Sequence, residues 1–119
     1  MKKVTIELDI PTPNHELPIQ VACAYYGITK ETLMKDRTTE GVNRRAIVYK
    51  VLSDELGMSP PEIACIFGFS RQNVSSQLLR IEFQIKMYLQ FSCAYFDIKQ
   101  LFLKLRREQE EWLTRMNNT

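Results

Sequence analysis

The segment 60–81, PPEIACIFGFSRQNVSSQLLRI, predicts two short helices joined by a tight turn. Ser59 precedes two prolines, and proline is tolerated in a first helical turn because its missing N–H would have no partner there. Gly68 can end the first helix, since glycine adopts the left-handed conformation of a helix C-cap without strain. Ser70 can begin the second helix by accepting a hydrogen bond from the N–H of Asn73. This pattern is typical of a helix-turn-helix.

The two predicted helices each have an apolar face. The inward residues are Ile63, Ala64 and Phe67 in the first helix and Val74, Leu78 and Ile81 in the second. The polar side of the second helix, with its cap, consists of Ser70, Arg71, Gln72, Asn73, Ser75, Ser76, Gln77 and Arg80. Arginine, glutamine and asparagine match purine edges in the major groove, and the first turns of such a helix are where a helix-turn-helix reads bases. We therefore expect these residues to bind double-stranded DNA.

Length and composition indicate one ordered globular domain. The chain has 119 residues, of which 45% are hydrophobic and 25% are charged. The net charge of +2 says little, because a nucleic-acid binder need only concentrate its positive charge on one face. Cys23, Cys65 and Cys93 are scattered through apolar helical patterns, which favours buried, reduced thiols in a cytoplasmic protein. No metal-ligand spacing, signal peptide or membrane span is recognisable, so we expect no cofactor, metal or membrane partner.

The rest of the chain predicts an all-α fold with an extended N-terminal arm. Residues 3–10 alternate apolar and polar, which is typical of a strand or an extended arm. Helical spacing follows at 17–26, at 30–36 and at 44–56. We expect an arm over 1–15, a helix-turn-helix domain over 16–91, and a C-terminal helix over 92–119.

A second candidate contact to DNA precedes the helix predicted at 44–56. Residues 37–45, RTTEGVNRR, contain a glycine and show no helical period, which indicates a loop. Its candidate DNA-binding residues are Arg37, Thr38, Asn43, Arg44 and Arg45. Such a donor-rich segment beside a helix N-terminus suits phosphates, and a mobile arginine can enter a minor groove. The alternative is an ordinary solvated loop whose positive charge Glu40 dilutes.

Four features follow one another along the chain. They are AYYGIT (24–29), the arginine segment (37–45), a helix that ends at Glu55 and Leu56, and PEIACIFG (61–68). Over roughly residues 19–82, this order resembles the DNA-binding domain of the bacterial replication initiator DnaA. The resemblance implies a Trp-repressor-like helix-turn-helix that acts as a replication or transcription regulator. It also implies that the second helix enters the major groove and that Arg44 matches the minor-groove arginine of the family.

The chain departs from that family at two places. The family turn reads Gly-Arg-Asp-His-Thr-Thr, whereas residues 69–73 read FSRQN and the turn is one residue shorter. The DNA sequence that the family recognises is therefore not implied for this chain. A glycine-rich phosphate loop that ends in Lys-Ser or Lys-Thr is also absent, so we expect a stand-alone domain without the ATPase module.

The C-terminal third predicts a long helical extension. Residues 80–91 continue the second helix of the helix-turn-helix, and Ser92 can cap a further helix over 93–116. Its apolar stripe consists of Tyr95, Ile98, Leu101, Phe102, Leu105, Trp112, Leu113 and Met116. This helix either folds back on the core of its own domain or pairs with a second copy. We favour a homodimer through the C-terminal helix, since so many aromatic residues exceed what a small core needs.

Three classes of function remain at this point. The first is sequence-specific binding of double-stranded DNA, and the alternative is a protein–protein interaction module on a helix-turn-helix scaffold. An enzyme ranks last, because no histidine–carboxylate pair, cysteine–histidine constellation or metal spacing supports a catalytic residue or a small-molecule substrate.

Overall fold

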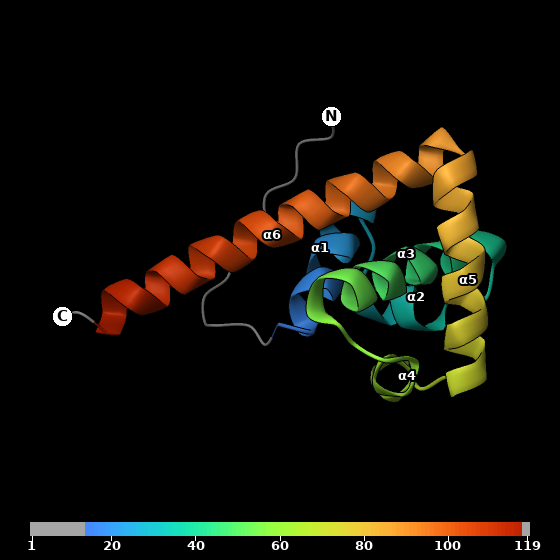
Figure 1. Ribbon diagram of the computed structural model, residues 1–119, viewed down its shortest axis with the longest axis horizontal. Helices are drawn as coiled ribbons and strands as arrows, with labels where there is room; N and C mark the ends of the chain where they lie inside the picture. Colours follow the sequence, from blue (N-terminus) through green and yellow to red (C-terminus); the bar gives the residue numbers. More distant parts are fainter. Residues whose placement is uncertain (1–13, 118–119) are drawn as a thin grey trace.

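The computed structural model describes residues 14–117, which form six helices (Figure 1). They are α1 (Glu16–Tyr26), α2 (Lys30–Lys35), α3 (Thr39–Leu56), α4 (Pro60–Phe67), α5 (Arg71–Met87) and α6 (Leu89–Asn117). The all-α prediction is confirmed over this part of the chain. The predicted arm lies outside the described residues except for 14 and 15, which form a turn before α1.

Local hydrogen bonds set the ends of the short helices as the sequence predicts. The hydroxyl of Thr29 accepts from the N–H of Thr32 at 3.1 Å, and α2 begins there. The hydroxyl of Ser70 accepts from the N–H of Asn73 at 3.0 Å, and α5 begins there. Gly68 ends α4 with φ of 74°, a left-handed conformation that strains any residue with a Cβ. The two helices of the helix-turn-helix are thus joined by three residues, 68–70.

The prediction of a loop over residues 37–45 is wrong, because α3 begins at Thr39 and includes most of that segment. Thr38 caps the helix: its hydroxyl accepts from the N–H of Gly41 at 3.2 Å. Gly41 is buried inside the helix, and a Cβ there would lie 2.5 Å from the side chain of Asp36. The glycine therefore serves close packing and does not break the helix.

The boundary between the last two helices also differs from the prediction. The sequence predicted that α5 continues to Phe91 and that Ser92 caps the next helix, but α5 ends at Met87. Tyr88 is extended, with φ of −126° and ψ of 124°, and α6 begins at Leu89. The chain turns sharply at Tyr88, so that α6 runs back over the domain (Figure 1).

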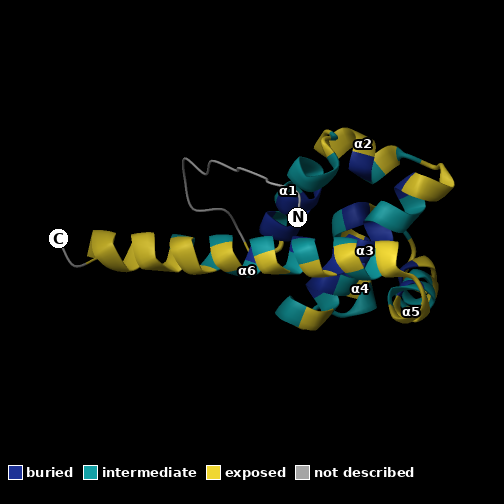
Figure 2. Ribbon diagram, turned by 90° about the horizontal axis from the view of Figure 1, so that it is seen from above, coloured by how far each residue is buried: buried dark blue, intermediate teal, exposed yellow. Residues whose placement is uncertain are grey.

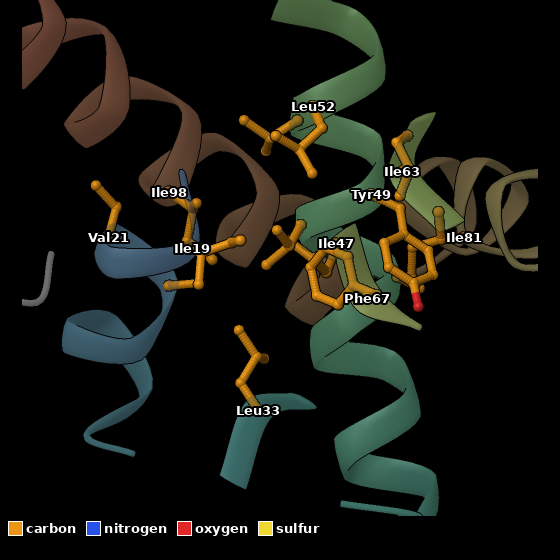
Figure 3. Packing of buried hydrophobic residues seen from close by; sticks show 14 of the residues in the cluster. Ile19, Val21, Leu33, Ile47, Tyr49, Leu52, Ile63, Phe67, Ile81 and Ile98 are labelled. Carbon is orange, nitrogen blue, oxygen red and sulfur yellow. The ribbon is translucent and has the colours of Figure 1, made fainter. Parts of the chain in front are cut away.

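The core lies around α3, which packs against every other helix. Figure 3 shows Tyr49 of α3 beside Phe67 of α4 and Ile81 of α5. The rings of Tyr49 and Phe67 meet edge to face with their centroids 4.9 Å apart, an arrangement that the aromatic quadrupoles favour. This contact fixes the helix-turn-helix to the body of the domain.

The first half of α6 belongs to this core. Tyr95, Ile98 and Phe102 are buried, and the hydroxyl of Tyr95 donates to Asp54 Oδ2 of α3 at 2.5 Å. The second half projects beyond the other helices and is mostly exposed (Figures 1 and 2). Of the two alternatives for this helix, folding back on its own domain is therefore confirmed for its first half.

The cysteines differ from the expectation of buried thiols. Cys65 and Cys93 are exposed, and only Cys23 is partly buried; all three are free. Cys65 follows the buried Ala64 on α4, and Cys93 lies on the outer side of α6, so neither continues the inward stripe of its helix. Over residues 14–117 no helix has the length and apolar character that crossing a membrane requires.

Candidate nucleic-acid interface

The first turn of α5 lies at an accessible end of the molecule. Arg71, Gln72 and Asn73 are all exposed. They stand at the end of α5 that lies next to α4, whereas α6 joins α5 at the opposite end (Figure 1). The C-terminal helix therefore does not cover the side chains that the sequence selects for base recognition.

The exposure of the other predicted residues, the cap Ser70 and four residues within α5, is less uniform. Ser70 and Ser76 are exposed, whereas Ser75, Gln77 and Arg80 are partly buried. A shallow groove between the start of α4 and the start of α5 is lined by Pro60, Pro61, Arg71, Gln72, Ser75 and Ser76. The groove thus brings the prolines that begin α4 together with polar side chains of the first turns of α5.

Arg80 ties α5 to α3. Its Nη1 donates to Asn43 Oδ1 at 2.8 Å and to Gln84 Oε1 at 2.6 Å, and its Nε donates to Gln77 Oε1 at 2.8 Å. Burial lowers the pKa of this guanidinium from its ordinary value. An arginine side chain titrates so far above neutral pH that the group stays charged there. Arg80 thus contributes positive charge to this face while three amide oxygens hold it in place.

The turn between α2 and α3 brings a further cation to the same face. Arg37 is exposed and shares a shallow cavity with Asn73 and Gln77 of α5. The other lining residues of this cavity are Val42, Arg45, Tyr49 and Phe69. The structure therefore brings together the two segments that the sequence selects separately.

Arg45 has a structural position that the sequence did not reveal. Its side chain is only 5% exposed, and its Nη1 donates to the carbonyl oxygens of Leu33 at 2.9 Å and Asp36 at 2.5 Å. Its guanidinium also lies over the ring of Phe69, with Cζ 5.1 Å from the centroid. Arg45 of α3 therefore connects the C-terminal end of α2 with the turn that follows α4. Its prediction as an exposed DNA contact is corrected accordingly.

The other members of the predicted loop are also engaged, with one exception. Arg44 pairs with Glu40 at 2.5 Å and lies over the ring of Tyr26 in α1, with Cζ 4.9 Å from the centroid. Thr38 caps α3, and Asn43 accepts from Arg80. Arg37 is the cation of this segment that the structure exposes, whereas the resemblance to DnaA points to Arg44.

The described residues offer no candidate metal site, and the comparisons with known proteins identify no relative. Within the described residues no group of three or more His, Cys, Asp and Glu side chains could hold a metal ion. Comparison of the chain with family models, with curated proteins and with solved structures finds no match. The resemblance to the DNA-binding domain of DnaA therefore stays a prediction that rests on the quoted residues.

Proposed function

We propose that this protein is a regulator of replication or transcription that binds double-stranded DNA with the first turns of α5 in the major groove. One observation carries the proposal: Arg71, Gln72 and Asn73 are exposed together at the N-terminus of α5, away from α6. These side chain types pair with base edges, and the N-terminal end of a helix carries partial positive charge that favours a phosphate backbone. A location in the cytoplasm, with reduced thiols, belongs to the same proposal.

Arg37 supports the proposal as a contact to the backbone or to the minor groove. It lies beside Asn73 and Gln77, so a duplex held by α5 would be within its reach. Arg80, held by Asn43, adds charge between the two segments. Contacts of this kind position a protein on DNA, whereas the base contacts of α5 give specificity.

Selection of bound duplexes from a random pool, followed by fluorescence anisotropy, tests the proposal. We expect affinity to fall steeply with salt, because phosphate contacts release counterions. Gln72→Ala or Asn73→Ala should cost about 1–3 kcal/mol at a selected site and relax its sequence preference. Arg37→Ala should weaken all duplexes evenly.

Arg107 provides the matched control. It is an exposed arginine on the projecting half of α6, far along that helix from α5 (Figure 1). Arg107→Ala removes the same charge as Arg37→Ala but should leave the affinity for duplex DNA nearly unchanged. Duplex binding that is undetectable at low salt, or that both arginine variants weaken equally, would refute the proposed interface.

A protein–protein interaction module is the second candidate, and one observation favours it. One side of α5 carries an exposed apolar stripe that consists of Leu79, Phe83 and Met87. Contiguous exposed apolar side chains often mark a surface that binds another protein. Pull-down with mass spectrometry and light scattering separates the candidates. A stable complex with another protein that covers residues 71–80 together with Phe83 and Met87, without duplex binding, would replace DNA binding by this function.

A further inference from the structure

An apolar surface surrounds the turn between α5 and α6. We call it the elbow surface; it comprises Leu79 (73% exposed), Phe83 (60%), Met87 (61%), Tyr88 (53%) and Leu89 (79%). The first three are four residues apart and share one side of α5, opposite the buried Val74 and Ile81. Tyr88 and Leu89 follow Met87 directly in the chain, at the turn where α5 ends and α6 begins.

The size of this surface is close to that of a protein interface. Five large side chains with these exposures present on the order of 600 Å², taking the two aromatic ones at about 150–250 Å² when fully exposed and the leucines and the methionine near the lower end of that range. That is at the upper end of the largest apolar patches of monomeric proteins, which measure about 300–600 Å². One side of a stable interface buries about 800 Å². The elbow surface can supply most of that area.

We propose that the elbow surface pairs with the elbow surface of a second copy, with the two α5 helices antiparallel about a two-fold axis beside Gln84. Residues of α5 equally far before and after Gln84 then lie side by side, and Leu79 of each copy lies next to the turn at Tyr88, where α5 of the other copy ends. Phe83 lies next to the axis and meets its own counterpart. An isologous contact of this kind is the commonest arrangement in soluble oligomers.

Charge complementarity favours the antiparallel direction. Glu82 and Lys86 flank the stripe on one side of α5, with their charged atoms 3.9 Å apart and both side chains well exposed. In the antiparallel pair, Glu82 of each copy faces Lys86 of the other, which gives two reciprocal ion pairs. A parallel two-fold pair would instead put this flank of the two copies on opposite sides of the contact, where Glu82 and Lys86 cannot reach each other and these two ion pairs are not made.

The same arrangement leaves the candidate DNA-binding turns accessible. The second copy's α5 ends at Met87 and its chain turns away into α6, so the first turn of α5 extends past it. With a rise of about 1.5 Å per residue, the two copies of Gln72 are about 36 Å apart along the helices. Half-sites one turn of DNA apart are separated by about 34–36 Å. This match rests on the proposed function, whereas the pairing itself does not.

Sedimentation equilibrium of the full chain without DNA tests the pairing. We expect a reversible dimer, and Phe83→Glu should raise its dissociation constant at least about 30-fold, as for a central hot-spot residue. Helicity should not change, because Phe83 is largely exposed. The matched control is Leu113→Glu on the projecting part of α6, which is 38% exposed and should leave the dimer intact. A dimer that Leu113→Glu dissociates and Phe83→Glu does not would move the interface to the C-terminal helix and overturn the proposal.

The register is tested by exchanging charges. Glu82→Lys or Lys86→Glu alone should weaken the dimer about 3- to 10-fold, because each places like charges at both ion pairs. The double exchange should restore the dissociation constant to within about twofold of the original. A chain that stays monomeric at all concentrations, or a double variant no tighter than the singles, would overturn the proposal. The DNA function is tested separately by binding of Phe83→Glu to a duplex with one half-site. Binding to a single half-site requires only one copy of the protein, so it does not depend on the dimer.

Discussion

Replacement of Arg45 by alanine should destabilise the fold, although the sequence places Arg45 among exposed DNA contacts. The guanidinium is 5% exposed and donates to the carbonyl oxygens of Leu33 and Asp36. Each hydrogen bond from a charged donor contributes about 1.5–3 kcal/mol, and water reaches the half-buried Asp36 once the side chain is removed. We therefore expect Arg45→Ala to lower the free energy of unfolding by about 2–4 kcal/mol.

Arg37 provides the comparison, because it is an arginine of the same segment with an exposed side chain. Urea unfolding, followed by far-ultraviolet circular dichroism and extrapolated linearly to zero denaturant, gives both free energies. Arg37→Ala should change stability by less than about 0.5 kcal/mol, as is usual for surface positions, while weakening duplex binding. An Arg45→Ala protein as stable as the original would refute the assignment of Arg45 to the interior.

Three further predictions concern the contacts that hold the interface in place. Tyr95→Phe removes the hydrogen bond to Asp54 and should lower the free energy of unfolding by about 1 kcal/mol, measured by urea unfolding. Gly68→Ala should cost about 1–2 kcal/mol in the same assay, because φ is 74° while nothing lies within 4 Å of an added Cβ. The pKa of Glu62 is lowered from 4.5 because its carboxylate accepts from the N–H and the hydroxyl of Ser59. A carboxyl with a lowered pKa stabilises the fold above its unfolded pKa and loses that effect as pH falls, so the difference in Tm between the original and Glu62→Gln should shrink below pH 4.5.

The helix-turn-helix could be predicted because its signals are local. Pro60 and Ser70 mark where α4 and α5 begin, and Gly68 marks where α4 ends. A cap hydrogen bond spans three residues, so it depends on neighbours in the sequence alone. The same reasoning identified Thr29 as the cap of α2.

The two wrong boundaries depend on contacts that the pattern of residue types does not show. Gly41 looks like a loop residue until Asp36 is seen to occupy the space of its missing side chain. The turn at Tyr88 carries no glycine or proline, and it arises because α6 packs back over α1 and α3. Neither effect leaves a period or a turn signal in the sequence.

The candidate site divides in the same way. The sequence alone determined that Arg71, Gln72 and Asn73 stand on the outer side of a helix, because the 3.6-residue period separates them from Val74 and Ile81. Only the tertiary structure decided which arginine of residues 37–45 joins them. A long side chain beside a helix can equally point into the core or into solvent, and packing buries Arg45 while it leaves Arg37 exposed. The choice depends on carbonyl groups and rings that folding brings together from separate parts of the chain.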